Sequence, residues 1–200
     1  MGILDGKVAI VTGAGKGLGE AEAVCLAREG ATVTVCSRTL AGVQRVAKRI
    51  EEEGGRALAL ACEVRKRDDV KRVVAETVKK FGTVTIMLNN AQIMPASQHP
   101  MEEWTEQEMR DAWESGLLGS WFFMVECLPH IKAVKYGKII NTCSAAGHGN
   151  VPQLVGYSTT KEATRSLTRC GAREWGKYGM TVNTLSPVAM TSAGERRRDL

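Results

Sequence analysis

The segment Val8-Ala-Ile-Val-Thr-Gly-Ala-Gly-Lys-Gly-Leu-Gly19 decides how this chain folds. Its first four residues, 8–11, are a continuous apolar run of the kind that forms a buried β-strand. Four glycines follow within the next eight residues, and they let the backbone turn sharply and approach a ligand closely. An alanine-rich helix is predicted from about Gly17 to Glu29, with Gly30 ending it. Because free N–H groups at a helix N-terminus attract anions, this strand–turn–helix unit predicts a phosphate-binding site.

Two common phosphate-binding motifs do not match this turn. A P-loop needs Ser or Thr after Gly-Lys, but Gly17 follows Lys16, and a strict G-x-G-x-x-G fails because position 18 is leucine. The pattern that fits is T-G-x-x-x-G-x-G. A tight turn without a ligand is the alternative, although four glycines exceed what such a turn requires. The turn residues predicted to contact a cofactor are Gly13, Gly15, Lys16, Gly17, Leu18 and Gly19.

The rest of the chain repeats the alternation of buried strands and amphipathic helices. Further strands are predicted at 32–36, 57–62, 84–88, 138–142 and 180–185. Helices are predicted at 43–50, at 70–81, in two stretches within 101–134, and at 157–175. This order predicts an α/β fold of the Rossmann type, a doubly wound parallel sheet between two layers of helices. Ligands of such sheets bind at the carboxyl ends of the strands.

Composition narrows the class of protein. The 200 residues, with 44% hydrophobic and 24% charged, suit a single globular domain spanning 1–200. With 27 basic and 22 acidic residues the net charge is +5, and only 5% are aromatic, so no nucleic-acid partner is expected. No apolar run suits a membrane span and no signal peptide is evident, so we expect no membrane partner.

The cysteines and histidines predict neither disulfides nor a metal site. The six cysteines are widely spaced and contain no C-x-x-C pair, which favours buried free thiols in the reducing cytoplasm. The three histidines, His99, His130 and His148, are too scattered for a metal motif.

The end of the second predicted strand indicates which dinucleotide binds. An NAD-binding domain usually carries Asp or Glu there to hold the ribose 2′-hydroxyl, but this chain has Ser37 and then Arg38. Lys16 in the glycine turn is expected to face the same ribose. Two cations without a carboxylate suit a 2′-phosphate, so NADP(H) is predicted as the cofactor. The alternative is that both are solvated surface charges.

A second constellation carries acid–base chemistry. Tyr157 and Lys161 are four residues apart at the start of a predicted helix, so they share one face. An ammonium beside a phenol is expected to favour the phenolate, which makes the tyrosine a usable acid–base group. Ser144 follows the strand at 138–142, and the chain returns from there to the helix at Tyr157. A tyrosine and lysine at this spacing alone would be weak evidence, since a surface pair gives the same pattern, but the glycine turn strengthens it.

With these motifs in order, the chain resembles the single-domain, NADP-preferring branch of the short-chain dehydrogenase/reductase family. The shared segments are T12-G-A-G-K-G-L-G19, N89-N-A-Q92, Ser144, Y157-S-T-T-K161 and N183-T-L-S-P187. The resemblance implies that Ser144 polarises a carbonyl or hydroxyl oxygen, that Tyr157 transfers the proton and that Lys161 supports it. It also implies a cofactor site that includes Glu63, Val64, Asn89, Asn90, Ala91, Tyr157, Lys161, Pro187 and Thr191.

The implied reaction is reduction of a ketone or oxidation of a secondary alcohol. The substrate is a small molecule and is left open among 3-oxoacyl thioesters, steroids and other cyclic ketones. The strand end Cys36-Ser37-Arg38 is similar to that of plant tropinone reductases. The resemblance further implies a homodimer or homotetramer formed through the long helices, where Trp104, Trp113 and Trp121 are expected to lie in the core or an interface.

Several positions depart from the family pattern. Gly116 replaces an asparagine that is usually catalytic, Gln92 replaces a glycine, and Val188 replaces another glycine. Glu63-Val64 stands where Asp-Val is usual. The alternative function is therefore a catalytically weakened dinucleotide-binding scaffold, but intact Ser144, Tyr157 and Lys161 favour an active enzyme. An ATPase is disfavoured because its motif is missing. Family members run further, so the chain is expected to lack a substrate loop and a final strand.

Overall fold

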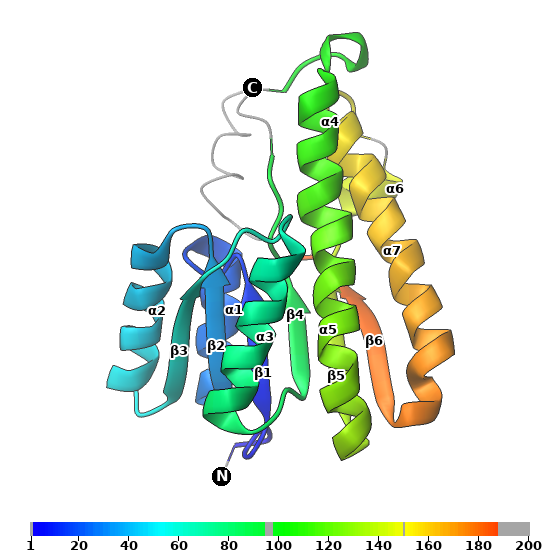
Figure 1. Ribbon diagram of the computed structural model, residues 1–200. Coiled ribbons are helices and arrows are strands. Elements are labelled where there is room, and N and C mark those ends of the chain that lie inside the picture. Colours follow the sequence, from blue (N-terminus) through cyan, green and yellow to red (C-terminus); the bar gives the residue numbers. More distant parts are fainter. Residues whose placement is uncertain (1, 95–97, 150, 188–200) are drawn as a thin grey trace.

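A computed structural model of the chain describes residues 2–94, 98–149 and 151–187, and its centre is a six-stranded parallel sheet (Figure 1). The strand order is β3-β2-β1-β4-β5-β6. The strands are β1 (Val8–Thr12), β2 (Thr32–Ser37), β3 (Arg56–Ala61), β4 (Ile86–Asn89), β5 (Gly137–Thr142) and β6 (Met180–Leu185). The order reverses between β1 and β4, and a reversal of this kind opens a crevice for a ligand at the carboxyl ends.

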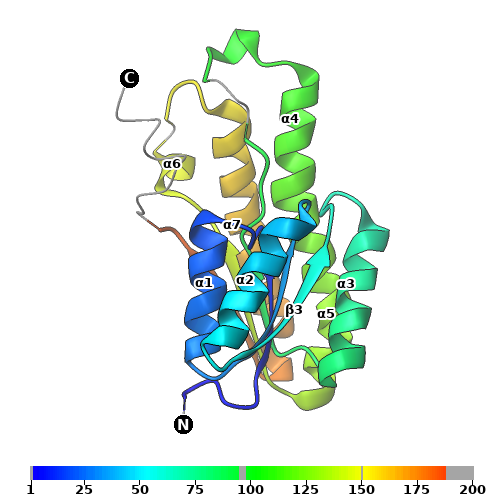
Figure 2. The same ribbon diagram turned by 90° about the vertical axis from the view of Figure 1, so that its left-hand side faces the viewer.

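Helices cover both faces of the sheet, so the predicted three-layer doubly wound fold is confirmed (Figure 2). The α-helices are α1 (Gly17–Arg28), α2 (Leu40–Glu52), α3 (Arg67–Phe81), α4 (Glu106–Trp113), α5 (Gly119–Val134), α6 (Ala145–His148) and α7 (Val155–Trp175). Short 3₁₀ turns span Met101–Glu103 and Gly176–Tyr178. One apolar cluster lies under α1 and α2, and the other lies under α3, α5 and α7.

The central strand shows why its sequence is apolar throughout. All five residues of β1 are buried; Ala9 and Val11 pack under α1 and α2, whereas Ile10 packs on the opposite face. A strand covered on both faces has no solvent side, so it needs no alternation with polar residues.

Most predicted elements differ from the observed ones by one to three residues at their ends, and two differences have a clear structural cause. Strand β4 starts at Ile86 instead of Val84, because the side chain of Thr85 takes part in the pairing there: its Oγ1 accepts a hydrogen bond of 2.9 Å from the Val8 N–H. The second difference is a continuous helical path from Glu106 to Val134, in which a π-helical segment (Glu114–Leu118) joins α4 to α5.

That helical path is long and apolar enough to cross a membrane by length and composition alone. However, Phe123, Met124, Cys127 and Ile131 are fully buried against the sheet, which accounts for much of its apolar character. All six cysteines are free, as predicted, but only four are buried. Cys25 and Cys170 are exposed, so their prediction as buried thiols was wrong.

Candidate active site

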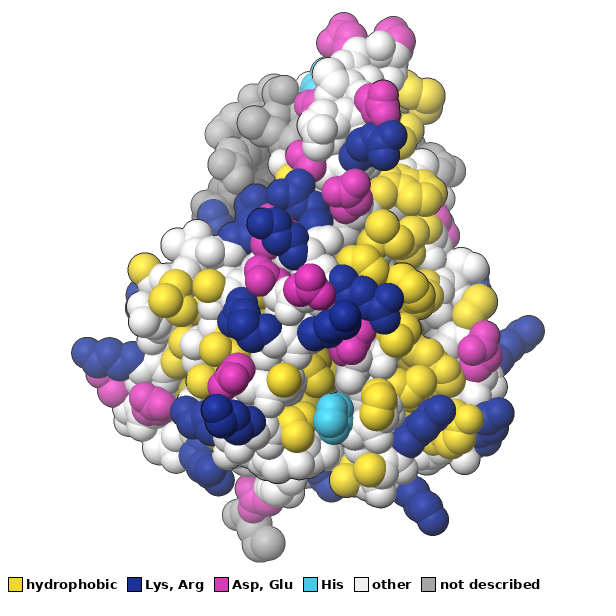
Figure 3. Space-filling model, viewed as in Figure 1, with side chains coloured by type: hydrophobic (Ala, Val, Ile, Leu, Met, Phe, Trp, Pro, Cys, Tyr) yellow, Lys and Arg dark blue, Asp and Glu magenta, His cyan; other side chains and the backbone are white. Residues whose placement is uncertain are grey.

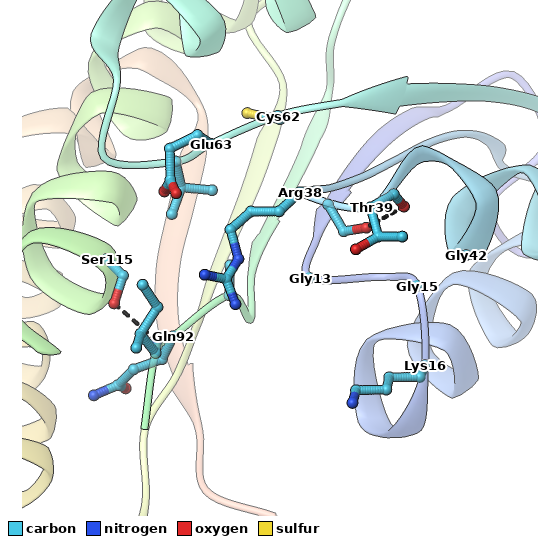
Figure 4. A pocket seen from close by; sticks show the side chains of 14 residues that line it. Gly13, Gly15, Lys16, Arg38, Thr39, Gly42, Cys62, Glu63, Gln92 and Ser115 are labelled. Carbon is cyan, nitrogen blue, oxygen red and sulfur yellow. Dashed lines mark hydrogen bonds between the residues drawn. The ribbon is translucent and has the colours of Figure 1, made fainter. Parts of the chain in front are cut away.

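A cavity of about 480 Å³ lies at the carboxyl ends of the strands (Figure 4). Of the residues predicted to contact a cofactor, the structure brings eight to its wall: Gly13, Gly15, Lys16, Ser37, Arg38, Glu63, Val64 and Ala91. Thr39, Gly42, Cys62, Gln92, Ile93 and Ser115 complete the lining. Gly17, Leu18, Gly19, Asn90 and Pro187 do not line this cavity, and Thr191 and Val188 lie outside the described residues.

The glycine turn has the geometry that its sequence predicts. Gly13 and Gly17 adopt φ of +65° and +60°, a region that favours glycine. At Gly19, an added Cβ would lie 2.6 Å from the Asn90 amide nitrogen and 2.6 Å from the Gly13 carbonyl oxygen. The first turn of α1 can therefore approach the end of β1 only because position 19 has no side chain. The backbone N–H groups of this first turn lie at the end of the helix that faces the cavity.

Asn90 holds this turn in place instead of lining the cavity. Its side-chain amide donates to the Thr12 carbonyl at 3.1 Å, and its backbone N–H donates to Thr12 Oγ1 at 3.0 Å. Asn89, also predicted as a cofactor contact, does not line the cavity either. Asn89 is 4% exposed, and its amide donates to Asn141 Oδ1 at 2.8 Å inside the fold.

Asn141 in turn donates to Thr168 Oγ1 at 2.9 Å. This buried chain ties β4, β5 and α7 together, and sequence reasoning missed it. The only available signal was two asparagines at the ends of apolar strands, and that pattern does not reveal which side chains face each other.

At the end of β2 the cavity is positively charged. The Arg38 guanidinium extends into the cavity, and Lys16 lies on the side of the glycine turn (Figure 4). Of the described residues that line the cavity, Glu63 is the one with a carboxylate. Its partner is Arg65 at 2.9 Å, whose hydrogen bond lowers the pKa of Glu63. Among the described residues no carboxylate forms a salt bridge with Arg38, so this cation is available to a ligand.

Ser144, Tyr157 and Lys161 do not line this cavity, although Thr160 on the same helix as Tyr157 and Lys161 lies across Gly116 from the lining residue Gln92. Ser144 precedes α6, and its Oγ accepts a 3.2 Å hydrogen bond from the Ala146 N–H. Tyr157 lies in the first turn of α7, and Lys161 lies one turn further on. The hydroxyl of Ser158 donates to the Ala146 carbonyl at 2.9 Å, which fixes the Ser144 turn to the start of α7. Sequence reasoning did not single out Ser158.

Lys161 is the most constrained of the three. Its side chain is buried, its Nζ donates to the Thr142 carbonyl at 2.6 Å, and it lies 5.3 Å from the centre of the Tyr157 ring. Burial lowers the pKa of Lys161 to about 8, because the protein interior disfavours the charged form. The ammonium is thus held beside the phenol by a backbone carbonyl instead of a carboxylate.

Two departures from the family pattern fit each other in space. A Cβ added to Gly116, in the π-helical segment, would lie 2.5 Å from Thr160 Cγ2 and 3.0 Å from Gln92 Cδ. The Gln92 carboxamide and the Thr160 methyl therefore occupy the space that a side chain at position 116 would need. Both polar atoms of that carboxamide are buried without a hydrogen-bond partner in the described protein.

The fold and the site together define a dinucleotide-binding α/β protein with an acid–base residue group beside the cofactor cavity. The sequence model of a family described as short chain dehydrogenase matches residues 7–199. This chain belongs to the short-chain dehydrogenase family and is an oxidoreductase of that family.

Individual relatives agree with this assignment. The chain is 38% identical over 200 residues to a 12alpha-hydroxysteroid dehydrogenase from Clostridium sp., covering 96% of this chain and 76% of that protein. It is 35% identical to an L-fucose dehydrogenase from Oryctolagus cuniculus, covering 91% of this chain but 62% of that protein. The chain therefore spans only part of the length of these relatives.

Among solved structures with this fold, one contains NAD+ and another contains NADP. An NAD+-bound xylitol dehydrogenase is similar with a TM-score of 0.93 and 27% identity, covering 98% of this chain and 75% of that one. A metagenomic short-chain oxidoreductase in complex with NADP is similar with a TM-score of 0.87 and 27% identity, covering 93% and 84%. The similarity thus supports a nicotinamide dinucleotide, and the choice between the two forms depends on this chain's own residues.

Proposed function

We propose that this protein is an NADP(H)-dependent oxidoreductase that interconverts a ketone and a secondary alcohol. The observation that carries the proposal is the cation at the end of β2: Arg38 extends into the cavity where an acidic residue would hold an unphosphorylated ribose. A 2′-phosphate needs such a charge-assisted contact, and Lys16 supplies a second cation in the same cavity.

The residues present fit a dinucleotide. The backbone of Gly13, Gly15 and the first turn of α1 would hold the pyrophosphate, and Arg38 with Lys16 would hold the 2′-phosphate. Val64 and Ala91 offer apolar walls along the cavity. When bound, the nicotinamide donates or accepts a hydride.

The acid–base step falls to the residues on α7 and after β5. The oxygen of Ser144 already accepts a hydrogen bond from the Ala146 N–H, so its own hydroxyl hydrogen can donate to a substrate oxygen. Tyr157 gives a proton to that oxygen during reduction and takes it back during oxidation. The ammonium of Lys161 supplies positive charge beside the phenol.

The sequence relatives support one substrate class. The two that are named above are called a 12alpha-hydroxysteroid dehydrogenase and an L-fucose dehydrogenase, which supports a cyclic secondary alcohol or the matching ketone for this chain. A 3-oxoacyl thioester is the alternative substrate. We also propose a cytoplasmic location, which the free cysteines support.

The experiment that tests this function is a turnover assay by nicotinamide absorbance. Purified protein would be given NADPH or NADH with ketosteroids, small cyclic ketones and keto-acyl thioesters, and NADP+ or NAD+ with hydroxysteroids and sugars. We expect turnover of at least one cyclic ketone or alcohol, faster with the phosphorylated cofactor. Equal or better turnover with the unphosphorylated cofactor would overturn the cofactor assignment.

A catalytically weakened scaffold is the second candidate function, and one observation favours it. Gln92 fills the space beside Gly116, where the family usually carries a further catalytic side chain. This alternative predicts tight NADPH binding in a fluorescence titration but no turnover of any substrate in the same panel.

A further inference from the structure

Arg45 on α2 reaches the glycine turn, from which it is separated by 30 residues of sequence. Its guanidinium nitrogen Nη2 donates to the Gly15 carbonyl at 3.1 Å. The guanidinium also binds Glu20 in the first turn of α1: Nη1 donates to Glu20 Oε1 at 2.8 Å, and Nη2 donates to Oε2. Arg45 therefore connects α2 with both the glycine turn and α1.

The glycine turn and the start of α2 are in close contact beside this arginine (Figure 4). A Cβ added to Gly15 would lie 3.0 Å from Ser37 Oγ, and a Cβ added to Gly42 would lie 3.3 Å from the Gly15 carbonyl oxygen. The turn and the corner that carries Arg38 are thus packed against each other without side chains between them. Arg45 adds a hydrogen bond to this contact from a side chain that is 56% exposed.

The bond from Arg45 fixes the direction of the peptide unit that joins Gly15 to Lys16. In a trans peptide the carbonyl and the following N–H point in opposite directions, and the described residues contain no cis peptide bond. Because the Gly15 carbonyl faces Arg45 on α2, the Lys16 N–H points away from Arg45. Lys16 is the N-cap residue of α1, so this peptide unit is the link between the turn and the helix.

Arg45 differs from the two cations that face the cavity. Lys16 and Arg38 are among the described residues that line it, and Arg45 is not. The terminal nitrogens of Arg45 already have acceptors in the Gly15 carbonyl and the Glu20 carboxylate. The hydrogen bond from Arg45 lowers the pKa of Glu20, which keeps that partner ionised. These contacts favour an effect on the turn over a direct contact with a phosphate.

We infer that Arg45 is a positioning residue of the dinucleotide site. It holds the peptide unit between Gly15 and Lys16 through the carbonyl, and Glu20 holds the guanidinium in place for that bond. The turn is thereby ordered before a dinucleotide binds, so binding loses less conformational freedom. The inference rests on the proposed binding of a nicotinamide dinucleotide at this turn. It depends neither on the preference for NADP(H) nor on the substrate.

The experiment measures cofactor affinity by fluorescence titration in variants of α2. In Arg45→Met, which keeps an unbranched side chain but removes the donors, NADPH and NADH should both bind about 3- to 10-fold more weakly, because both use the same turn. Arg45→Lys keeps the charge but lacks the planar fork, so its affinities should fall between those of Arg45→Met and the unaltered protein.

Arg49→Met is the matched control. Arg49 lies one turn further along α2 and also donates to Glu20, at 3.3 Å, but no hydrogen bond links it to the turn among the described residues. This variant removes the same charge and should keep both affinities within about twofold, as expected for an exposed ion pair. The two methionine variants should unfold at similar temperatures, so a loss of affinity confined to Arg45→Met is not a loss of stability.

Three results would overturn the inference. Weaker binding of NADPH alone in Arg45→Met would show a direct contact with the 2′-phosphate. Full affinity in Arg45→Lys would show that charge suffices, and equal losses in Arg45→Met and Arg49→Met would show a general electrostatic effect.

A second measurement needs no cofactor. In ¹⁵N-labelled protein without ligand, the backbone order parameters of Gly15 and Lys16 should fall in Arg45→Met and stay unchanged in Arg49→Met, because only the first variant frees the peptide unit. Unchanged order parameters in Arg45→Met would contradict the inference. If the unaltered protein binds neither dinucleotide, the proposed function fails, whereas the relaxation measurement still decides whether Arg45 orders the turn.

Discussion

Arg38 is the residue on which cofactor choice depends. Beside it, the uncharged Ser37 donates from Oγ to the Thr39 carbonyl at 3.0 Å, and the carboxylate of Glu63 is already bound by Arg65 at 2.9 Å. An acidic side chain at position 38 would repel a 2′-phosphate and accept hydrogen bonds from a free ribose. The sign of the charge at position 38 therefore determines whether this cavity prefers the phosphorylated or the unphosphorylated cofactor.

The Arg38→Asp variant should bind NADPH about 10- to 100-fold more weakly, because a hydrogen bond to a charged group is worth roughly 1.5–3 kcal/mol. NADH binding should be equal or better. Fluorescence titration with each cofactor measures both affinities. Lys48→Asp, an exposed position on α2, makes the same charge change away from the cavity and controls for net charge. Equal losses in the two variants would contradict a specific contact.

Glu22 on α1, whose carboxylate oxygens are buried, predicts how stability depends on pH. Burial raises its folded pKa to about 7, above the ordinary value of 4.5, so folding favours the protonated form. The stability from this group is fully present below pH 4.5 and is lost as pH rises through 7. At pH 8 the free energy of unfolding of Glu22→Gln should therefore exceed that of the unaltered protein by about 1–2 kcal/mol. At pH 4.5 the difference should be much smaller. Urea denaturation at both values measures this, and a constant difference would contradict it.

Among the elements, those with a clear sequence period could be predicted and those shaped by packing could not. The run 8–11 and the glycines after it predicted β1, the turn and α1, because each depends on local backbone preferences. The π-helical segment at 114–118 had no such signal. It lies where Ser115 Oγ accepts from the Ile93 N–H at 2.8 Å, a contact between segments far apart in the chain.

The same reason limited what could be predicted of the site. Ser144, Tyr157 and Lys161 were found because their spacing is a motif, and the structure places them on adjoining segments. Gln92 and Gly116 each appeared as an isolated departure, and their complementarity emerges only when the loop after β4 meets the helix. A glutamate in α1 gave no sequence signal that it would be buried.

The fit around Gly116 predicts the cost of adding a side chain. Gly116→Ala should destabilise the protein by about 1–3 kcal/mol, because the new Cβ overlaps the Thr160 methyl and the Gln92 carboxamide. Thr160→Ser in the same chain should recover part of this loss. Gly176→Ala is the matched control, since an added Cβ there meets no atom within 4 Å. Thermal unfolding compares the variants, and equal effects at positions 116 and 176 would contradict the fit.

On the scale of the whole molecule, the helices α4 and α5 carry an exposed apolar band (Figure 3). Trp113, Leu118 and Trp121 are 40%, 39% and 38% exposed. A depression beside Trp113 and Leu118 is also lined by Met109, Arg110 and Glu114. Large exposed apolar patches mark association sites, so we propose that a second copy of the chain covers this band. The expectation that Trp113 and Trp121 lie in a core does not hold, and an interface is the remaining reading.

This surface makes a prediction about assembly. The unaltered protein should have the mass of a dimer or tetramer. The double variant Leu118→Glu/Trp121→Glu should have the mass of a monomer, because burying the two new charges in an apolar contact has a high desolvation cost. Light scattering after gel filtration measures both. Ile3→Glu, at a residue 84% exposed near the N-terminus, is the control and should leave the assembly unchanged. A monomeric unaltered protein would contradict the proposal.

Tyr157 is proposed to transfer the proton in a reaction dependent on NADP(H). The decisive measurement is NADPH oxidation by the unaltered protein and by Tyr157→Phe, with the best ketone from the substrate panel. We expect turnover to fall at least about 100-fold, as for loss of a general acid, while NADPH binding by fluorescence stays within about threefold. Turnover in Tyr157→Phe close to that of the unaltered protein would rule out this role of Tyr157.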